Sequence, residues 1–204
     1  MLHGFRAVGK STTAKLLAAK LGWQYIEMDQ QIEKLAEMPI NKLTQNGKDW
    51  VPMRRLENQV LRETLRLEHV VISAGGGVAV NGIIDLDTGM AFGELNSELI
   101  QGCESLMNVV LYVGEDVLRK RIAKDEMNQS ETKRPVLNSQ LASQINVNEI
   151  SKEELVKIIV DDAMKMYQVR KPLYDKLSGY QVDTEKSSPE EVVEKIFSIM
   201  LKLK

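Results

Sequence analysis

The feature that most constrains the fold of this chain is a glycine-rich motif close to its N-terminus. Residues 4–11 read Gly-Phe-Arg-Ala-Val-Gly-Lys-Ser, which matches G-x-x-x-x-G-K-[ST] without a mismatch. The glycines let backbone N–H groups and the N-terminus of a following helix surround phosphate groups. Lys10 is expected to contact the β- and γ-phosphates, and the Ser11 hydroxyl to bind Mg²⁺. The motif predicts a P-loop that binds a nucleoside triphosphate through Gly4, Phe5, Arg6, Ala7, Val8, Gly9, Lys10, Ser11 and Thr12.

Beyond the motif, short apolar segments alternate with helical patterns. The expected strands cover residues 23–28, 69–73, 108–113 and 180–183, besides the few residues before the P-loop. The expected helices cover residues 10–21 and 53–67, begin near residue 116, run from 151 towards 170, and begin again at 189. Pro172 is expected to end or kink the fourth of these helices.

This alternation predicts an α/β fold of three layers, with a parallel sheet of about five strands covered by helices on both faces. Residues 1–204 are expected to form one domain. Ligands of such sheets bind beyond the carboxyl ends of the strands. Residues 81–104 and 125–148 show the weakest patterns and are expected to be mobile. Only three residues precede Gly4, so we expect a short first strand or a clipped start.

Composition restricts the class of protein. The 27 basic and 29 acidic residues nearly cancel, which leaves no basic excess for binding nucleic acid. Cys103 is the only cysteine, so a reducing compartment is expected. We read no signal peptide and no apolar run long enough to span a bilayer. The expectation is a cytoplasmic monomer with no membrane partner.

Two further segments offer polar groups at the ends of the expected strands. Glu27 and Asp29 are two apart on a strand and would point the same way, which suits a magnesium-bound water and a substrate hydroxyl. As an isolated pair they could also be a solvated strand end. Gly75, Gly76 and Gly77 follow the next strand, and such a run indicates that a ligand or another backbone comes close.

Several cations remain to be placed. Arg54 opens a helix, where an arginine is often merely solvated, and Arg170 ends one, where it would also favour the helix dipole. Arg134 lies in a weakly patterned segment and could neutralise charge on a triphosphate. His3 and His69 form no metal-binding pair, and we assign them no role.

Together these motifs resemble the shikimate kinase family from Gly4 to about Asp183. Besides the P-loop, the resemblance rests on Asp29-Gln-Gln-Ile-Glu33, Arg54-Arg-Leu-Glu57, Gly75-Gly-Gly77, Arg134-Pro-Val-Leu137 and Arg170-Lys-Pro-Leu-Tyr174. It implies phosphorylation of shikimate by ATP with Mg²⁺. It also implies a nucleoside-monophosphate-kinase-like P-loop kinase fold, with a mobile lid at about 125–150 and an acceptor-binding segment at about 29–60.

The resemblance also implies roles for individual residues. Asp29 orients the attacking hydroxyl, and Glu27 helps to hold Mg²⁺ through water. Lys10, Asp29 and Arg134 are the implied catalytic residues. Arg54 and Arg170 clamp the substrate carboxylate beside the triple glycine, Arg121 packs on the adenine, and Arg134 reaches the phosphates from the lid.

The chain departs from the family pattern in places. Glu27 replaces the usual Asp, Met53 the usual Phe, and residues 47–54, 81–104 and 138–148 are expanded. Two other functions stay open. One is a related kinase acting on gluconate or a nucleoside monophosphate, because this fold serves many substrates. The other is a nucleotide-binding regulator without catalysis.

Overall fold

A parallel sheet forms the centre of the molecule, whose computed structural model describes residues 1–128, 135–145, 150–177 and 179–202. Its five strands stand in the order β2-β3-β1-β4-β5, and every neighbouring pair is parallel. The strands are β1 (Leu2–His3), β2 (Gln24–Glu27), β3 (Val70–Ser73), β4 (Val109–Tyr112) and β5 (Gln181–Asp183). The central strand is therefore the one that runs into the P-loop.

The expected strands are confirmed, although each is shorter than its apolar run. Leu2 of the two-residue β1 pairs with Ser73 on one side and Val109 on the other. His69 has a φ of 54°, so β3 starts only after it. Met28 already belongs to a helix, so β2 ends at Glu27. The two halves of the sheet are thus joined at β1 by three residue pairs.

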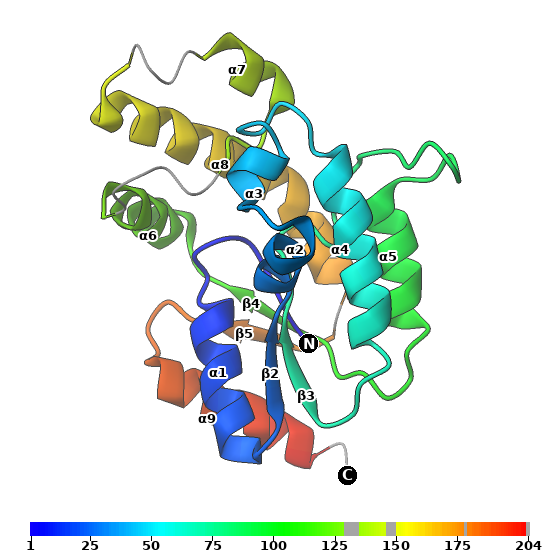
Figure 1. Cartoon of the computed structure of the whole chain (residues 1–204). Coiled ribbons are helices and arrows are strands. Elements are labelled where there is room, and N and C mark those ends of the chain that lie inside the picture. Colours follow the sequence, from blue (N-terminus) through cyan, green and yellow to red (C-terminus); the bar gives the residue numbers. More distant parts are fainter. Residues whose placement is uncertain (129–134, 146–149, 178, 203–204) are drawn as a thin grey trace.

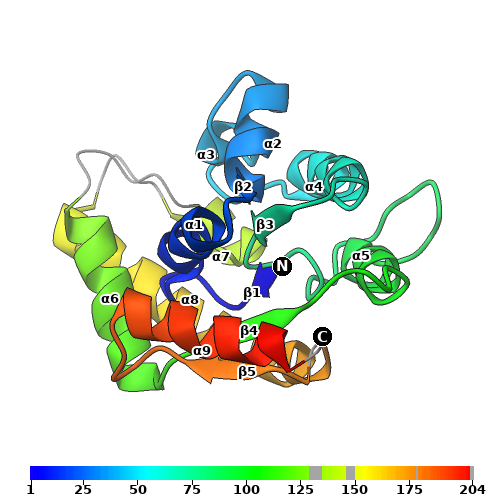
Figure 2. The ribbon, with the colours of Figure 1, turned by 90° about the horizontal axis from the view of Figure 1, so that it is seen from below.

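Helices cover both faces of this sheet, as the alternating pattern predicted. Figure 1 and Figure 2 show α1 on one side of the strands and α4 with α5 on the other, and α9 packs along α1. The helices of the described residues are α1 (Lys10–Leu21), α2 (Met28–Ala36), α3 (Ile40–Leu43), α4 (Val51–Thr64), α5 (Phe92–Gln101), α6 (Glu115–Met127), α7 (Ser139–Gln144), α8 (Lys152–Leu177) and α9 (Pro189–Leu201). The three-layer α/β fold is confirmed.

Local sequence explains where two of these helices begin or end. Gly22 adopts a left-handed conformation with a φ of 67°, and its N–H bonds to the carbonyls of Ala18 and Ala19, which ends α1. Ser188 and Glu191 form a reciprocal capping box, and Pro189 occupies the first position of α9. Both signals were readable in the sequence.

Three of the remaining segments contain more helix than the sequence pattern indicated. Residues 81–104 contain the helix α5, and residues 125–148 contain the end of α6 and all of α7. The long helix α8 continues past Pro172 to Leu177, because Tyr174 and Leu177 are buried there. Tertiary packing thus outweighs the hydrogen bond that a proline removes.

The core lies between the sheet and its helices. Its largest fully buried side chains include Leu2 of β1, Ile72 of β3, Leu111 of β4 and Leu118 of α6. A second small cluster of Val136, Ala142, Leu155 and Ile159 packs the 136–144 segment against the start of α8. Within the described residues, no helix combines the length and apolarity needed to cross a membrane.

Candidate active site

The phosphate-binding loop connects β1 to α1 at the carboxyl end of the central strand. Its backbone has positive φ angles at Gly4 (134°), Ala7 (62°) and Gly9 (99°). A Cβ at Gly4 would collide with the carbonyl oxygen of Leu111, so only glycine fits there. The loop can therefore pass close to the backbone of β4.

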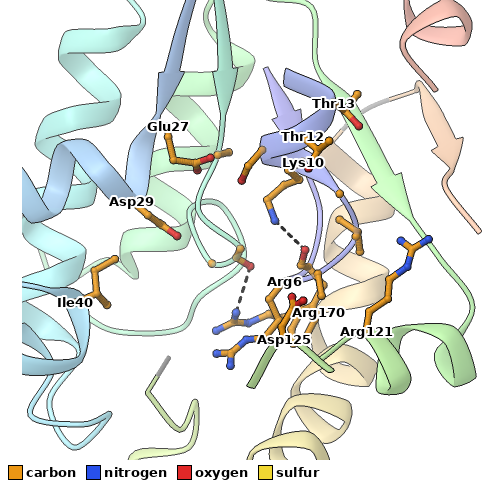
Figure 3. A pocket seen from close by; sticks show the side chains of 18 of the residues that line it. Arg6, Lys10, Thr12, Thr13, Glu27, Asp29, Ile40, Arg121, Asp125 and Arg170 are labelled. Carbon is orange, nitrogen blue, oxygen red and sulfur yellow. Dashed lines mark hydrogen bonds between the residues drawn. The ribbon is translucent and has the colours of Figure 1, made fainter. Parts of the chain in front are cut away.

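The helix that follows this loop presents an open N-terminus. No side chain caps α1, and its first turn carries no acidic residue, so its leading N–H groups are available to an anion. Lys10 Nζ donates a hydrogen bond of 2.8 Å to the Phe5 carbonyl, which holds the ammonium group across the loop (Figure 3). Ser11, the next residue, is exposed. The loop thus has the geometry expected of a phosphate site.

The two candidate carboxylates lie where β2 gives way to α2. The prediction that both stand on one strand is wrong, because Asp29 occupies the first turn of α2. Both nevertheless line the same cavity and are drawn there in Figure 3. Glu27 is only 9% exposed, and its Oε2 accepts a 2.6 Å hydrogen bond from the Tyr25 hydroxyl. Burial is the main cause that raises the pKa of Tyr25, and the hydrogen bond to Glu27 raises it further.

A buried ion pair holds the first candidate arginine. Arg54 of α4 is 3% exposed, and its Nη1 donates to Glu57 Oε2 at 2.6 Å one helical turn away. Its guanidinium also lies over the ring of Trp50, 4.9 Å from the ring centre. Within the described residues, Arg54 Nε is buried and has no hydrogen-bond partner. Glu57 and Trp50 therefore hold this arginine in place, and its Nε–H can still donate to a further acceptor.

Each glycine of the 75–77 loop meets a different neighbour. A Cβ on Gly75 would lie 2.7 Å from Glu57 Oε1 and 3.0 Å from Asp29 Oδ1. A Cβ on Gly77 would lie 2.6 Å from Arg54 Nη2. At Gly76 the nearest atom would be the backbone N of Arg6, at 3.5 Å. The loop therefore lies against α2, α4 and the P-loop together, and its contacts with α2 and α4 account for glycine at positions 75 and 77.

The second candidate arginine approaches from α8. Arg170 is 7% exposed, and its Nη1 donates to the Gly76 carbonyl at 3.2 Å (Figure 3). Tyr174, one turn later, donates to the same carbonyl. Burial lowers the pKa of Arg170, and burial raises the pKa of Tyr174 to about 12. Arg170 Nε is buried without a partner in the described part of the chain, like that of Arg54.

The opposite end of the cavity is organised around Thr184, just beyond β5. Arg121 of α6 donates to the Thr184 carbonyl at 2.8 Å and to its hydroxyl at 3.1 Å. The Thr184 hydroxyl in turn donates to the Val8 carbonyl of the P-loop at 2.9 Å. Arg121 is therefore linked through Thr184 to the phosphate-binding loop.

One cavity of about 660 Å³ brings most of the predicted residues together. Gly4 and Gly75 are not among the residues that line it, and Arg134 lies outside the described residues. Arg6 reaches Pro135 across this cavity, donating to its carbonyl at 3.4 Å. The predicted residues that line it are Phe5, Arg6, Ala7, Val8, Gly9, Lys10, Ser11, Thr12, Glu27, Asp29, Arg54, Gly76, Gly77, Arg121 and Arg170.

Four residues of the site were not assigned from the sequence. Glu57 and Tyr174 stand one helical turn from the arginines that they accompany, so an i,i+3 or i,i+4 partner search would have found them. Tyr25 shares a strand face with Glu27, which period-two spacing could have indicated. Trp50 precedes its helix and contacts Arg54 from outside the expected bounds, so no local pattern marks it.

The chemistry of the donor set fits magnesium bound together with a nucleotide. The described residues contain no group of three His, Cys, Asp or Glu side chains that could hold a metal alone. Ser11 and Glu27 instead offer a hydroxyl and a carboxylate beside the phosphate-binding loop. Mg²⁺ prefers such oxygen ligands and usually keeps phosphate and water ligands as well.

Comparison with known proteins identifies relatives of this architecture. The family model described as "Shikimate kinase" matches residues 6–201. A shikimate kinase of Thermoanaerobacter pseudethanolicus is 38% identical over 82 residues, which cover 40% of this chain and 47% of the relative. One of Prosthecochloris aestuarii is 42% identical over 81 residues, or 39% of this chain and 40% of the relative. The chain therefore spans less than half of the length of these curated relatives.

Solved structures share the fold over nearly the whole chain. The shikimate kinase from Acinetobacter baumannii in complex with shikimate has a TM-score of 0.74 at 21% identity, covering 100% of this chain and 92% of that one. The shikimate kinase from Bacteroides thetaiotaomicron has a TM-score of 0.66 at 24% identity, with coverages of 98% and 96%. At these identities the likeness establishes the shared fold.

Proposed function

The chain belongs to the shikimate kinase family, and we propose that it transfers the γ-phosphoryl group of ATP to shikimate, giving shikimate 3-phosphate and ADP. The observation that carries the proposal is the pair of buried arginines, Arg54 and Arg170, which line the same cavity as a P-loop. A small acceptor with a carboxylate and hydroxyls suits that arrangement.

The acceptor end is proposed to read the carboxylate. Arginine donates in a fixed fork that matches a carboxylate, and a buried guanidinium gains strength from exclusion of water. The buried Nε atoms of Arg54 and Arg170 lack hydrogen-bond partners in the described residues, which supports a role toward an added anion. Glu57 and Asp29 approach Gly75, and Arg54 approaches Gly77, so closely that neither position has room for a side chain.

The reacting groups are proposed to lie between the two ends. Asp29, in the first turn of α2, would accept a hydrogen bond from the attacking hydroxyl and orient it. Lys10 would leave the Phe5 carbonyl for the β- and γ-phosphates. Ser11 and Glu27 would hold Mg²⁺, which when bound neutralises charge on the phosphates. Catalysis of this kind is mostly positioning and electrostatic stabilisation.

The remaining assignments belong to the same proposal. Arg121 would pack on the adenine, supported by its double contact with Thr184. Arg134 would reach the phosphates from a lid at about 125–150, while residues 29–60 would hold the acceptor. We also propose one domain over 1–204, acting as a cytoplasmic monomer. A lone cysteine and the use of ATP support that compartment.

The decisive experiment is an ADP-release assay with ATP, Mg²⁺ and shikimate. Turnover that depends on shikimate supports the proposal, and no turnover above the ATPase background would refute it. A panel with gluconate and nucleoside monophosphates at fixed ATP identifies another acceptor if one is preferred. ATP binding without phosphorylation of any acceptor would instead favour a regulatory protein.

Two neighbouring arginines offer a matched pair of variants. Arg54→Ala should raise the KM for shikimate about tenfold or more while the KM for ATP stays unchanged, because a charge-assisted contact is lost only at the acceptor end. Arg55→Ala removes the adjacent arginine, which is half exposed and 3.8 Å from Asp87, and should leave both constants within about twofold of the parent values.

A further inference from the structure

The Tyr25 hydroxyl occupies a place between the two residues proposed to hold Mg²⁺. Tyr25 and Glu27 are two apart on β2, so their side chains project from the same face of the strand. This spacing brings the Tyr25 hydroxyl to 2.6 Å from Glu27 Oε2. The Ser11 side chain lowers the pKa of Tyr25 and therefore lies near its hydroxyl. One phenol thus adjoins both groups.

The surroundings of Tyr25 fix its ring against α1. Ser11 and Lys15 stand four residues apart on α1 and so share one helical face. Lys15 Nζ lies 5.6 Å from the centre of the Tyr25 ring, within the range of a cation–π contact. The ring is half-buried between this face and β2. Its hydroxyl is held in position rather than free to point into solvent.

The carboxylate of Glu27 needs such a partner. It is 9% exposed, and a buried carboxylate is costly unless it is hydrogen-bonded. Glu27 also has one methylene more than the aspartate usual at this position, and therefore one more rotatable bond to restrain. A hydrogen bond to Oε2 restrains that bond and leaves Oε1 free to accept from a metal-bound water.

We propose that Tyr25 is a positioning residue: its hydroxyl holds the Glu27 carboxylate beside Ser11, in the orientation in which both take part in binding the Mg²⁺ of the nucleotide complex. This inference deepens the proposed function and rests on it for the presence of a magnesium nucleotide. Partners that orient metal ligands commonly change metal affinity by tenfold or more when removed.

The test measures metal binding without the acceptor. Free Mn²⁺ is quantified by electron paramagnetic resonance during titration of the full chain with saturating ADP. Tyr25→Phe should raise the apparent dissociation constant of Mn²⁺ about tenfold. Tyr112→Phe removes a hydroxyl from the exposed side of β4 and should leave the constant within about twofold. A Tyr25→Phe constant within twofold of the parent value would overturn the inference.

A double-mutant cycle separates positioning from general stability. In a Glu27→Gln background, Tyr25→Phe should change Mn²⁺ affinity less than twofold further, because the positioned carboxylate is already gone. An undiminished effect in that background, or a lower melting temperature with unchanged Mn²⁺ affinity, would overturn the role. Since shikimate is absent, failure of the proposed kinase activity shows in the ADP-release assay and not in this one.

Discussion

Replacing Gly77 with alanine should selectively weaken binding of the acceptor. The new Cβ would lie 2.6 Å from Arg54 Nη2, and ordinary contact begins at about 3.4 Å, so the guanidinium must move by about 0.8 Å. Arg54 cannot yield freely, because Glu57 holds its Nη1 at 2.6 Å and Trp50 lies against its face. The displacement therefore falls on the donors proposed to meet the substrate carboxylate.

The size of the effect is set by the contact that is lost. A hydrogen bond to a charged group contributes about 2 kcal/mol, and each 1.4 kcal/mol is a factor of about ten in affinity. Gly77→Ala should therefore raise the KM for shikimate roughly 30-fold. The KM for ATP should stay within about twofold, because the three nearest atoms to the new Cβ all belong to Arg54 and none to the P-loop. Initial rates at varied shikimate and at varied ATP measure both constants.

Gly76→Ala provides the matched control. Its Cβ would meet no atom closer than 3.5 Å, so the KM for shikimate should change by less than about threefold. A parent-like KM for shikimate in Gly77→Ala, or an equally raised one in Gly76→Ala, would refute this effect on Arg54. Circular dichroism and the melting temperature of both variants establish that each is folded before the kinetics are compared.

Three further predictions concern stability and catalysis. Glu57→Gln should lower the free energy of unfolding by about 3 kcal/mol, because it leaves the Arg54 charge buried without its partner. Urea unfolding measures this loss. The double variant Glu57→Gln with Arg54→Met should recover most of it, because no buried charge then remains unpaired. Burial lowers the pKa of His3 from 6.5 to about 3, so an unfolded chain takes up the proton first as the pH falls. The neutral His3 contributes its full stability above pH 6.5, and about 2 kcal/mol of the free energy of unfolding should be lost between pH 6.5 and 5. Urea unfolding at the two pH values measures this loss, which His3→Gln should abolish. Lys10→Ala should lower the turnover number about a hundredfold in the ADP-release assay, since it removes the cation proposed to contact the transferred group; an unchanged turnover number would contradict this role.

The sheet was predictable because its strands carry continuous apolar runs bounded by glycine or polar residues. The helix α5 was not, since its buried face is partly polar. Asn96 is fully buried and donates to the Val78 carbonyl at 2.7 Å while accepting from Asn58 at 2.6 Å. Gly93 packs against the backbone of Asn81, where a larger side chain would collide. Hydrophobic periodicity detects such a helix poorly, because an amide and a glycine share its buried face with Phe92 and Ile100.

The site shows a similar division. Lys10, Glu27 and Asp29 were found because their motifs follow strand ends, where a parallel sheet gathers its ligands. The roles of Arg54 and Arg170, which lie in helices, came from the family resemblance. The geometry of Glu27 and Asp29 was misjudged, because the strand ends one residue before the expected limit and α2 turns Asp29 away from the line of the strand. Glu57 contacts the Arg54 side chain and Tyr174 the Gly76 carbonyl, so neither belongs to a motif with chemistry of its own.

The Gly76 peptide has a consequence for how the two ends of the cavity communicate. Its carbonyl accepts hydrogen bonds from both Arg170 and Tyr174. A Cβ on Gly76 would lie 3.5 Å from the backbone N of Arg6 and 3.6 Å from the carbonyl oxygen of Gly4. An acceptor that tightens Arg170 thus bears on the same peptide that supports the nucleotide loop. If the nucleotide changes the affinity for the acceptor by some factor, thermodynamic linkage requires the acceptor to change the affinity for the nucleotide by the same factor. Titrations of either ligand with and without the other should yield one common factor, and it should shrink toward unity when Tyr174→Phe loosens that peptide.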